Sequence, residues 1–126
     1  CMNKVNLGII IAVVVILIGG LFVYIKPSSS QSSGDYDSLA KCLTEKGVKM
    51  YGAFWCSHCQ NQKKAFGSSW QYVDYVECST PDGRSQTGEC SAAGIRGYPT
   101  WDFGNNTRLE GEVSFEDLSK NSGCEL

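Results

Sequence analysis

Six of the seven cysteines lie between residues 35 and 126, and this density constrains the chain more than any other feature of its sequence. That part of the chain is long enough for one hydrophobic core but not for two domains. Disulfides persist in oxidising compartments and are rare in the cytosol. We therefore expect one small domain on the extracytoplasmic side of a membrane, which means the periplasm, an organelle lumen or the cell surface.

A long apolar segment precedes this domain. Residues 7–25 carry no charge, and at about 1.5 Å of rise per residue they would form a helix of roughly 28 Å, close to the thickness of a bilayer core. Lys4 precedes the run and Lys26 follows it, so the charges weakly favour an exported C-terminal domain. The run is longer than a signal-peptide core and lacks an A-x-A-like site, which favours an uncleaved anchor.

The sequence thus predicts three parts, namely a single-pass membrane anchor or signal peptide at 1–26, a Ser-rich linker at 27–34 and a domain at 35–126. The small polar residues of the linker are typical of a flexible tether. The formal net charge is −2, which argues against a nucleic acid as partner. The single histidine excludes a multi-histidine metal site.

Hydrophobic periodicity predicts an α/β class for the domain. Apolar residues three or four apart indicate helices, and short aromatic or β-branched runs indicate strands. In chain order we expect a helix at 36–46, a strand at 48–55, a helix at 56–66, a strand at 72–78, a short helix at 88–93, a hairpin of 97–103 and 108–113, and a helix at 115–121. Such an order gives a mixed central sheet flanked by helices.

The motif Cys56-Ser57-His58-Cys59 follows a predicted strand and opens a predicted helix. Two thiols at i and i+3 can close a disulfide, and the helix N-terminus favours the thiolate of the first. Cys56 is therefore the expected nucleophile. A protonated His58 would stabilise the thiolate further, which makes the disulfide a stronger oxidant. On this interpretation the redox-active Cys56–Cys59 disulfide takes the place of a separate cofactor, and no metal is expected.

Other interpretations of this motif stay open. A CxxC can be half of a zinc site, although a four-ligand site would need two scattered cysteines that form no second CxxC. A metal-handling module could bind Cu(I) or zinc through Cys56, Cys59 and His58. A purely structural Cys56–Cys59 bridge is disfavoured, because so short a loop restricts the unfolded chain little.

Three blocks of the sequence resemble one family. The segments 51–59 (YGAFWCSHC), 75–78 (YVEC) and 94–101 (GIRGYPTW) are similar to the thioredoxin-like domain that is fused to, or partnered with, vitamin K epoxide reductase (VKOR) homologues in bacteria and plants. The resemblance covers residues 39–118. It implies a thioredoxin-like fold with Cys56 as nucleophile, Cys59 as buried resolving thiol and Pro99 in a cis-proline loop facing them.

A cis X-Pro bond turns the backbone sharply and leaves the polar groups of the preceding residue free to pair with an extended substrate. We expect Tyr98 and Trp55 at the substrate rim, although core packing alone would also explain Trp55. Thioredoxin-type reductases usually carry a buried acid six residues before the first cysteine, where this chain has Met50. A dedicated reductase is therefore disfavoured.

The remaining four cysteines can pair in three ways. A bridge between Cys78 and Cys90 would close the turn-rich loop between them, and a cysteine pair here also resembles the family. This pair is expected to be structural, with an electron relay as the alternative. By elimination Cys42 would pair with Cys124, or either could be a free thiol.

The sequence thus predicts a membrane-anchored, extracytoplasmic thiol–disulfide oxidoreductase acting on protein thiols. The resemblance implies that a separate VKOR-like quinone reductase in the membrane reoxidises Cys56 and Cys59, because this chain has only one hydrophobic segment. The alternatives are a disulfide reductase or isomerase fed by a membrane electron donor, and the Cu(I) or zinc module described above.

Overall fold

A computed structural model of the chain describes residues 4–24 and 35–126. They divide into two units, each of which we describe by itself. The first contains helix α1, Lys4–Tyr24, and the second contains the mixed α/β domain. The predicted linker, 27–34, lies outside the described residues.

The predicted membrane anchor is contradicted. Within 4–24 and 35–126 we find no helix whose length and apolar character together suffice to cross a bilayer. A spanning helix needs about 20 predominantly apolar residues. The transmembrane helix that we predicted at 7–25 as part of the fold class is therefore wrong.

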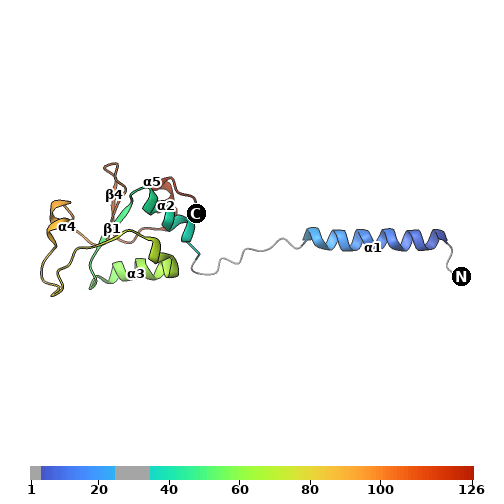
Figure 1. Ribbon diagram of the computed structural model, residues 1–126, viewed down its shortest axis with the longest axis horizontal. Helices are drawn as coiled ribbons and strands as arrows, with labels where there is room; N and C mark the ends of the chain where they lie inside the picture. The colour runs from blue at the N-terminus through green and yellow to red at the C-terminus, as the bar shows by residue number, and fades with distance from the viewer. Residues whose placement is uncertain (1–3, 25–34) are drawn as a thin grey trace. The chain divides into compact units, whose positions relative to one another are not determined.

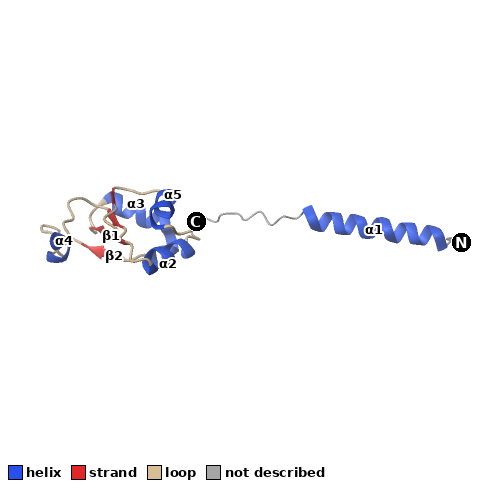
Figure 2. Ribbon diagram, turned by 90° about the horizontal axis from the view of Figure 1, so that it is seen from above, coloured by secondary structure: helices blue, strands red, loops and turns tan. Residues whose placement is uncertain are grey.

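The domain consists of short helices around a four-stranded sheet (Figure 1). Helix α4 lies at one end of the domain, and α2 and α5 lie at the other, in both Figure 1 and Figure 2. In chain order the elements are α2 (Asp37–Glu45), β1 (Lys49–Gly52), α3 (Ser57–Phe66), the 3₁₀ helix η1 (Gly67–Tyr72), β2 (Tyr75–Glu77), α4 (Gly88–Ala92), β3 (Thr100–Asp102), β4 (Arg108–Glu110) and α5 (Phe115–Ser122).

The sheet has the strand order β2-β1-β3-β4. Strand β1 pairs in parallel with β2, so that Gly52 lies opposite Glu77. It pairs antiparallel with β3, and β3 pairs antiparallel with β4. The parallel pair needs a crossover, which α3 and η1 supply. This four-stranded mixed sheet fits a thioredoxin-like fold.

Alternation along β1 creates a core on each face of the sheet. Met50 is fully buried in the larger cluster, which also contains Phe66, Trp101 and Leu118. Tyr51 points to the other face, into a smaller cluster with Cys78, Cys90 and Ile95. The larger cluster packs under α3, and this packing fixes the helix that carries the CxxC motif.

Several strands are shorter than the sequence predicts, and the hairpin predicted at 97–103 and 108–113 has strands only at Thr100–Asp102 and Arg108–Glu110. The strand predicted at 48–55 ends at Gly52, because the backbone N–H of Cys56 turns back to the carbonyl of Ala53 at 3.0 Å. The strand predicted at 72–78 begins only at Tyr75, since η1 occupies 67–72. Periodicity is a poor guide to a 3₁₀ segment because such runs are short and their side chains eclipse.

A buried glutamine attaches α3 to the chain beyond β4. Gln62 is 3% exposed. Its Oε1 accepts hydrogen bonds from the Val113 N–H at 2.8 Å and the Trp101 indole N–H at 3.4 Å, and its Nε2 donates to the Val113 carbonyl at 3.1 Å. One side chain therefore satisfies three buried polar groups, and losing it would leave them without partners.

We expect Gln62→Leu to lower the free energy of unfolding by about 3 kcal/mol, because unsatisfied buried groups carry their full desolvation cost. Urea unfolding followed by tryptophan fluorescence measures this change. Gln60→Leu on the same helix is the control, since Gln60 is exposed and donates one bond, to the Phe54 carbonyl at 2.9 Å. Equal losses in the two variants would contradict the assignment.

Candidate active site

The sulfur of Cys56 lies at the N-terminus of α3. Cys56 is the N-cap residue of that helix, and its Sγ accepts a hydrogen bond from the Cys59 N–H at 3.3 Å. The unpaired N–H groups and dipole of a helix N-terminus favour negative charge at this position. The side chain is 7% exposed. Cys56 is therefore the outer sulfur of the pair and lies at the helix N-terminus.

Cys59 lies one turn further along α3 and is inaccessible to solvent, with 0% exposure. Burial, and next the contact with Cys56, raise the pKa of the Cys59 thiol to about 12. Both cysteines are free thiols in this structure. The pair thus combines an outer sulfur placed for attack with an inner sulfur that is held in its protonated form.

The loop before β3 faces the outer sulfur. The Tyr98–Pro99 peptide bond is cis, and the Cys56 thiol donates to the Tyr98 carbonyl at a sulfur–oxygen distance of 3.6 Å. Trp55 is 53% exposed, and its ring meets the Tyr98 ring edge-on with centroids 5.9 Å apart. The structure therefore brings Trp55 and the Tyr98–Pro99 loop together beside Cys56.

His58 points toward a carboxylate. Its Nδ1 lies 2.6 Å from Oε1 of Glu112, which also accepts a hydrogen bond from Asn61 Nδ2 at 3.0 Å. These two bonds hold the pKa of Glu112 below its usual range. Both side chains are exposed. In the structure the hydrogen-bond partner of the His58 ring is therefore Glu112.

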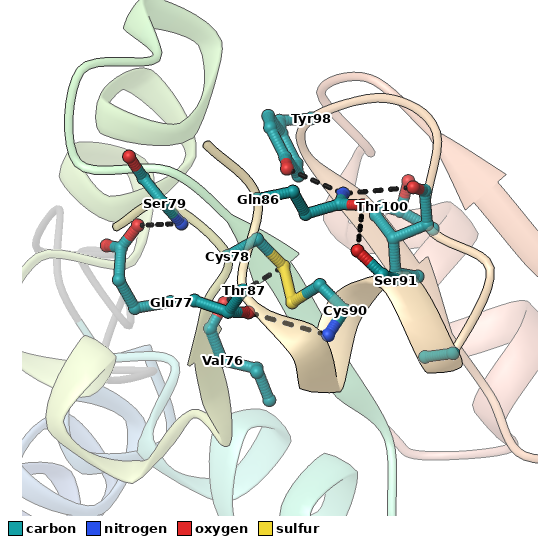
Figure 3. Close-up of a disulfide and its surroundings, with 12 residues drawn as sticks. Val76, Glu77, Cys78, Ser79, Gln86, Thr87, Cys90, Ser91, Tyr98 and Thr100 are labelled. Atoms are coloured by element: carbon teal, nitrogen blue, oxygen red, sulfur yellow. Dashed lines mark hydrogen bonds between the residues drawn. A yellow bond between two sulfur atoms is a disulfide. The ribbon is translucent and has the colours of Figure 1, made fainter. Parts of the chain in front are cut away.

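The second pair of sulfurs closes the loop before α4. Cys78 and Cys90 form a disulfide and are both fully buried. Figure 3 shows the side chain of Gln86 between Tyr98 and Ser91. Its Nε2 donates to the Tyr98 hydroxyl at 2.7 Å. The loop closed by this disulfide therefore contacts the cis-proline loop.

The same loop also contacts the residue before the nucleophile. The Trp55 indole N–H donates to Ser79 Oγ at 2.9 Å. Gly83 lies against both exposed aromatic side chains here, with Phe54 Cζ and Trp55 Cδ1 each 3.6 Å from the position that a Cβ would take. The loop thus packs against the two aromatic side chains that precede Cys56.

The third sulfur pair lies away from the site. Cys42 of α2 is bonded to Cys124, which follows α5, across a sequence separation of 82. This bridge joins the two helices that share one end of the domain (Figure 2). The position of the Cys42–Cys124 disulfide away from the site indicates a structural role.

Three residues near the site were not singled out from the sequence. Glu112 lies in the segment after β4 and contacts His58 only through the fold. Tyr75 and Glu77 lie on β2, and the Tyr75 hydroxyl donates to Glu77 Oε2 at 2.8 Å. Both residues are part of the YVEC block, but nothing in that block shows that the Glu77 carboxylate accepts hydrogen bonds from the Tyr75 hydroxyl and the Phe54 N–H. For metal binding, the described residues bring together no group of three or more histidine, cysteine or acidic side chains.

No family model matches the chain. It is 42% identical over 109 residues to the thiol-disulfide oxidoreductase LTO1 of Arabidopsis thaliana, which covers 82% of this chain and 28% of the plant protein. It is 32% identical over 84 residues to the probable protein disulfide-isomerase ER-60 of Schistosoma mansoni, covering 64% of this chain and 17% of that protein. The chain thus spans less than a third of either relative. The mixed sheet and the paired thiols fit a thioredoxin-like fold, and the chain is similar to parts of a thiol–disulfide oxidoreductase and of a probable protein disulfide-isomerase.

Proposed function

We propose that this protein oxidises pairs of thiols in other proteins through the Cys56–Cys59 disulfide. The observation that carries the proposal is the position of Cys56, whose sulfur takes the N-cap position of α3 and contacts the cis-proline loop. A reactive sulfur needs stabilisation of its thiolate and access for an extended peptide, and the two contacts supply these.

The reaction is ordinary thiol–disulfide exchange. A substrate thiolate attacks oxidised Cys56, so that the Cys56–Cys59 bond breaks and Cys59 leaves with the electron pair and takes up a proton. A second substrate thiolate then attacks the mixed disulfide at the substrate sulfur. The substrate departs with a new disulfide, and Cys56 and Cys59 remain as reduced thiols.

The direction of electron flow follows from which form the protein stabilises. The Cys59 N–H bonded to the Cys56 sulfur favours the thiolate, which exists only in the reduced pair. A stabilised reduced form makes the disulfide a better electron acceptor. The position used by thioredoxin-type reductases for a buried acid holds Met50, which is fully buried. Both features favour oxidation of substrates over their reduction.

The reduced pair must then pass its electrons to an acceptor. We propose that a VKOR-like quinone reductase is this acceptor, because three sequence blocks resemble the domain associated with such reductases. We also propose that the domain lies in an oxidising, extracytoplasmic compartment. The two disulfides outside the site support such a compartment.

The reduction potential of the Cys56–Cys59 pair tests the direction. The full chain carrying Cys1→Ser is equilibrated in glutathione buffers, so that the N-terminal thiol does not react. We expect a value well above the roughly −270 mV of thioredoxin, toward about −120 mV. A value at or below about −270 mV would contradict the oxidase and indicate a disulfide reductase.

A further inference from the structure

The Cys59 sulfur and the Tyr75 side chain both lie against the backbone of Gly52. A Cβ at this position would lie 3.0 Å from the Cys59 sulfur, 2.9 Å from Cε2 of Tyr75 and 3.3 Å from the Tyr75 hydroxyl oxygen. A residue with a side chain would thus force its neighbours apart. Because position 52 is glycine, the sulfur of α3 and the hydroxyl of β2 face the same small space.

The Tyr75 hydroxyl is hydrogen-bonded to a carboxylate. It donates to Glu77 Oε2 at 2.8 Å, while Glu77 Oε1 accepts hydrogen bonds from the backbone N–H of Ser79 at 2.9 Å and of Phe54 at 3.2 Å. Tyr75 and Glu77 are both half-buried. The carboxylate is therefore fixed in place, and one hydroxyl group connects it to the space beside Cys59.

Cys59 has to exchange a proton in every turnover. It gains one when it leaves Cys56 and loses one when it attacks a mixed disulfide on Cys56. It is fully buried, so bulk water does not reach it. The neighbouring residue of β1 on this face is Met50, which carries no titratable group. Burial raises the pKa of the Cys59 thiol, so an unassisted loss of its proton is slow at neutral pH.

We propose that Tyr75 and Glu77 form a proton relay for Cys59. When Cys59 attacks the mixed disulfide, its sulfur forms the Cys56–Cys59 bond and the other thiol leaves with the electron pair. The Cys59 proton passes to the Tyr75 oxygen as the Tyr75 proton passes to Glu77 Oε2, and the reverse transfer protonates Cys59 when it leaves. The relay rests on the proposed function, because it serves the exchange reaction of the same pair.

The other charged and titratable groups near this space come from α3 and the turn before it. Lys63 places its Nζ 3.9 Å from the centroid of the Tyr75 ring, and its charge lowers the pKa of Cys59. Cys56 acts in the opposite direction on both Cys59 and Tyr75. Burial, followed by the bond to Glu77, raises the pKa of Tyr75. The hydroxyl therefore keeps its proton at rest and acts only by passing one through.

The experiment separates the two cysteines by their order of reaction. The full chain with Cys1→Ser, selectively reduced at the site, is mixed with an equimolar amount of dithiobis-nitrobenzoate, an aromatic disulfide. Cys56 attacks first and releases one nitrothiobenzoate. Cys59 then attacks the mixed disulfide and releases the second. The two phases of absorbance report the two sulfurs separately.

We expect Tyr75→Phe to slow the second phase about 100-fold near pH 7, at the lower end of general acid–base effects, and to leave the first phase unchanged. The difference in second-phase rate between Tyr75→Phe and the unsubstituted site should decrease as the pH rises, because hydroxide then removes the Cys59 proton. Glu77→Gln keeps an oxygen for the two backbone N–H groups but loses the charge, and it should show the same pattern.

Tyr72→Phe is the matched control. The Tyr72 ring is also half-buried, with Lys41 Nζ 4.2 Å from its centroid, and its hydroxyl is not part of the relay. A second phase in Tyr75→Phe or Glu77→Gln as fast as in Tyr72→Phe would overturn the relay, as would slowing by the same factor at every pH. If the unsubstituted site releases no second nitrothiobenzoate, the proposed exchange function itself fails.

Discussion

Replacing Cys56 with serine should reduce oxidation of a dithiol peptide by at least about 1,000-fold, to the rate without enzyme. The substitution removes the sulfur at the N-cap of α3, and covalent catalysis has no second route when its nucleophile is lost. Chromatography separates the dithiol peptide from its disulfide form and gives the rate. Turnover above the uncatalysed rate would show that another group attacks the substrate.

Cys59→Ser is the matched variant, because it keeps the Cys56 sulfur and removes only the resolving thiol. Cys56, the outer of the two sulfurs, should form a mixed disulfide with a disulfide peptide and then fail to release it. Mass spectrometry detects this adduct as one peptide added to each chain. Accumulation of the same adduct in Cys56→Ser, or its absence in Cys59→Ser, would reverse or refute the roles given to the two sulfurs.

Replacing both Cys42 and Cys124 with alanine should lower the free energy of unfolding by about 4.5 kcal/mol. The bridge closes a loop with a sequence separation of 82, and the chain-entropy model gives a cost of this size for so long a loop. The total free energy of unfolding of a native domain is only about 5–15 kcal/mol. Urea unfolding under oxidising conditions measures the loss.

The matched comparison is Cys78→Ala with Cys90→Ala. This bridge closes a loop with a separation of only 12, for which the same model gives about 3 kcal/mol. Its loss should also disturb Trp55 and Tyr98 through Ser79 and Gln86. A smaller loss of stability in the Cys42 and Cys124 variant than in this one would contradict the assignment of the long bridge as the main restraint.

The parts that could be predicted from the sequence depend on near neighbours in the chain. The strand, turn and helix around the CxxC motif lie within one stretch, and each has its own local signal. The cysteine at the N-cap of α3 belongs to this group. Hydrogen bonds over three residues are fixed by local geometry.

The parts that could not be predicted depend on contacts between distant elements. Glu112 reaches His58 across 54 positions, and Tyr75 approaches Cys59 only because β2 lies beside β1 in a particular register. A shift of one residue in that register would turn Tyr75 to the opposite face of the sheet. Apolar composition also misled us at 7–25, where the described helix does not meet the requirement for spanning a membrane.

The long bridge has a consequence for how the chain acquires its structure during synthesis. Cys42 is made early, and its partner Cys124 follows only after Cys56, Cys59, Cys78 and Cys90. Each of these four thiols becomes available to Cys42 first. Correct pairing therefore requires that Cys42 stay reduced until Cys124 has been synthesised, or that an early non-native disulfide be rearranged later. A protein proposed to form disulfides in other proteins would thus itself depend on correct disulfide pairing before it is active.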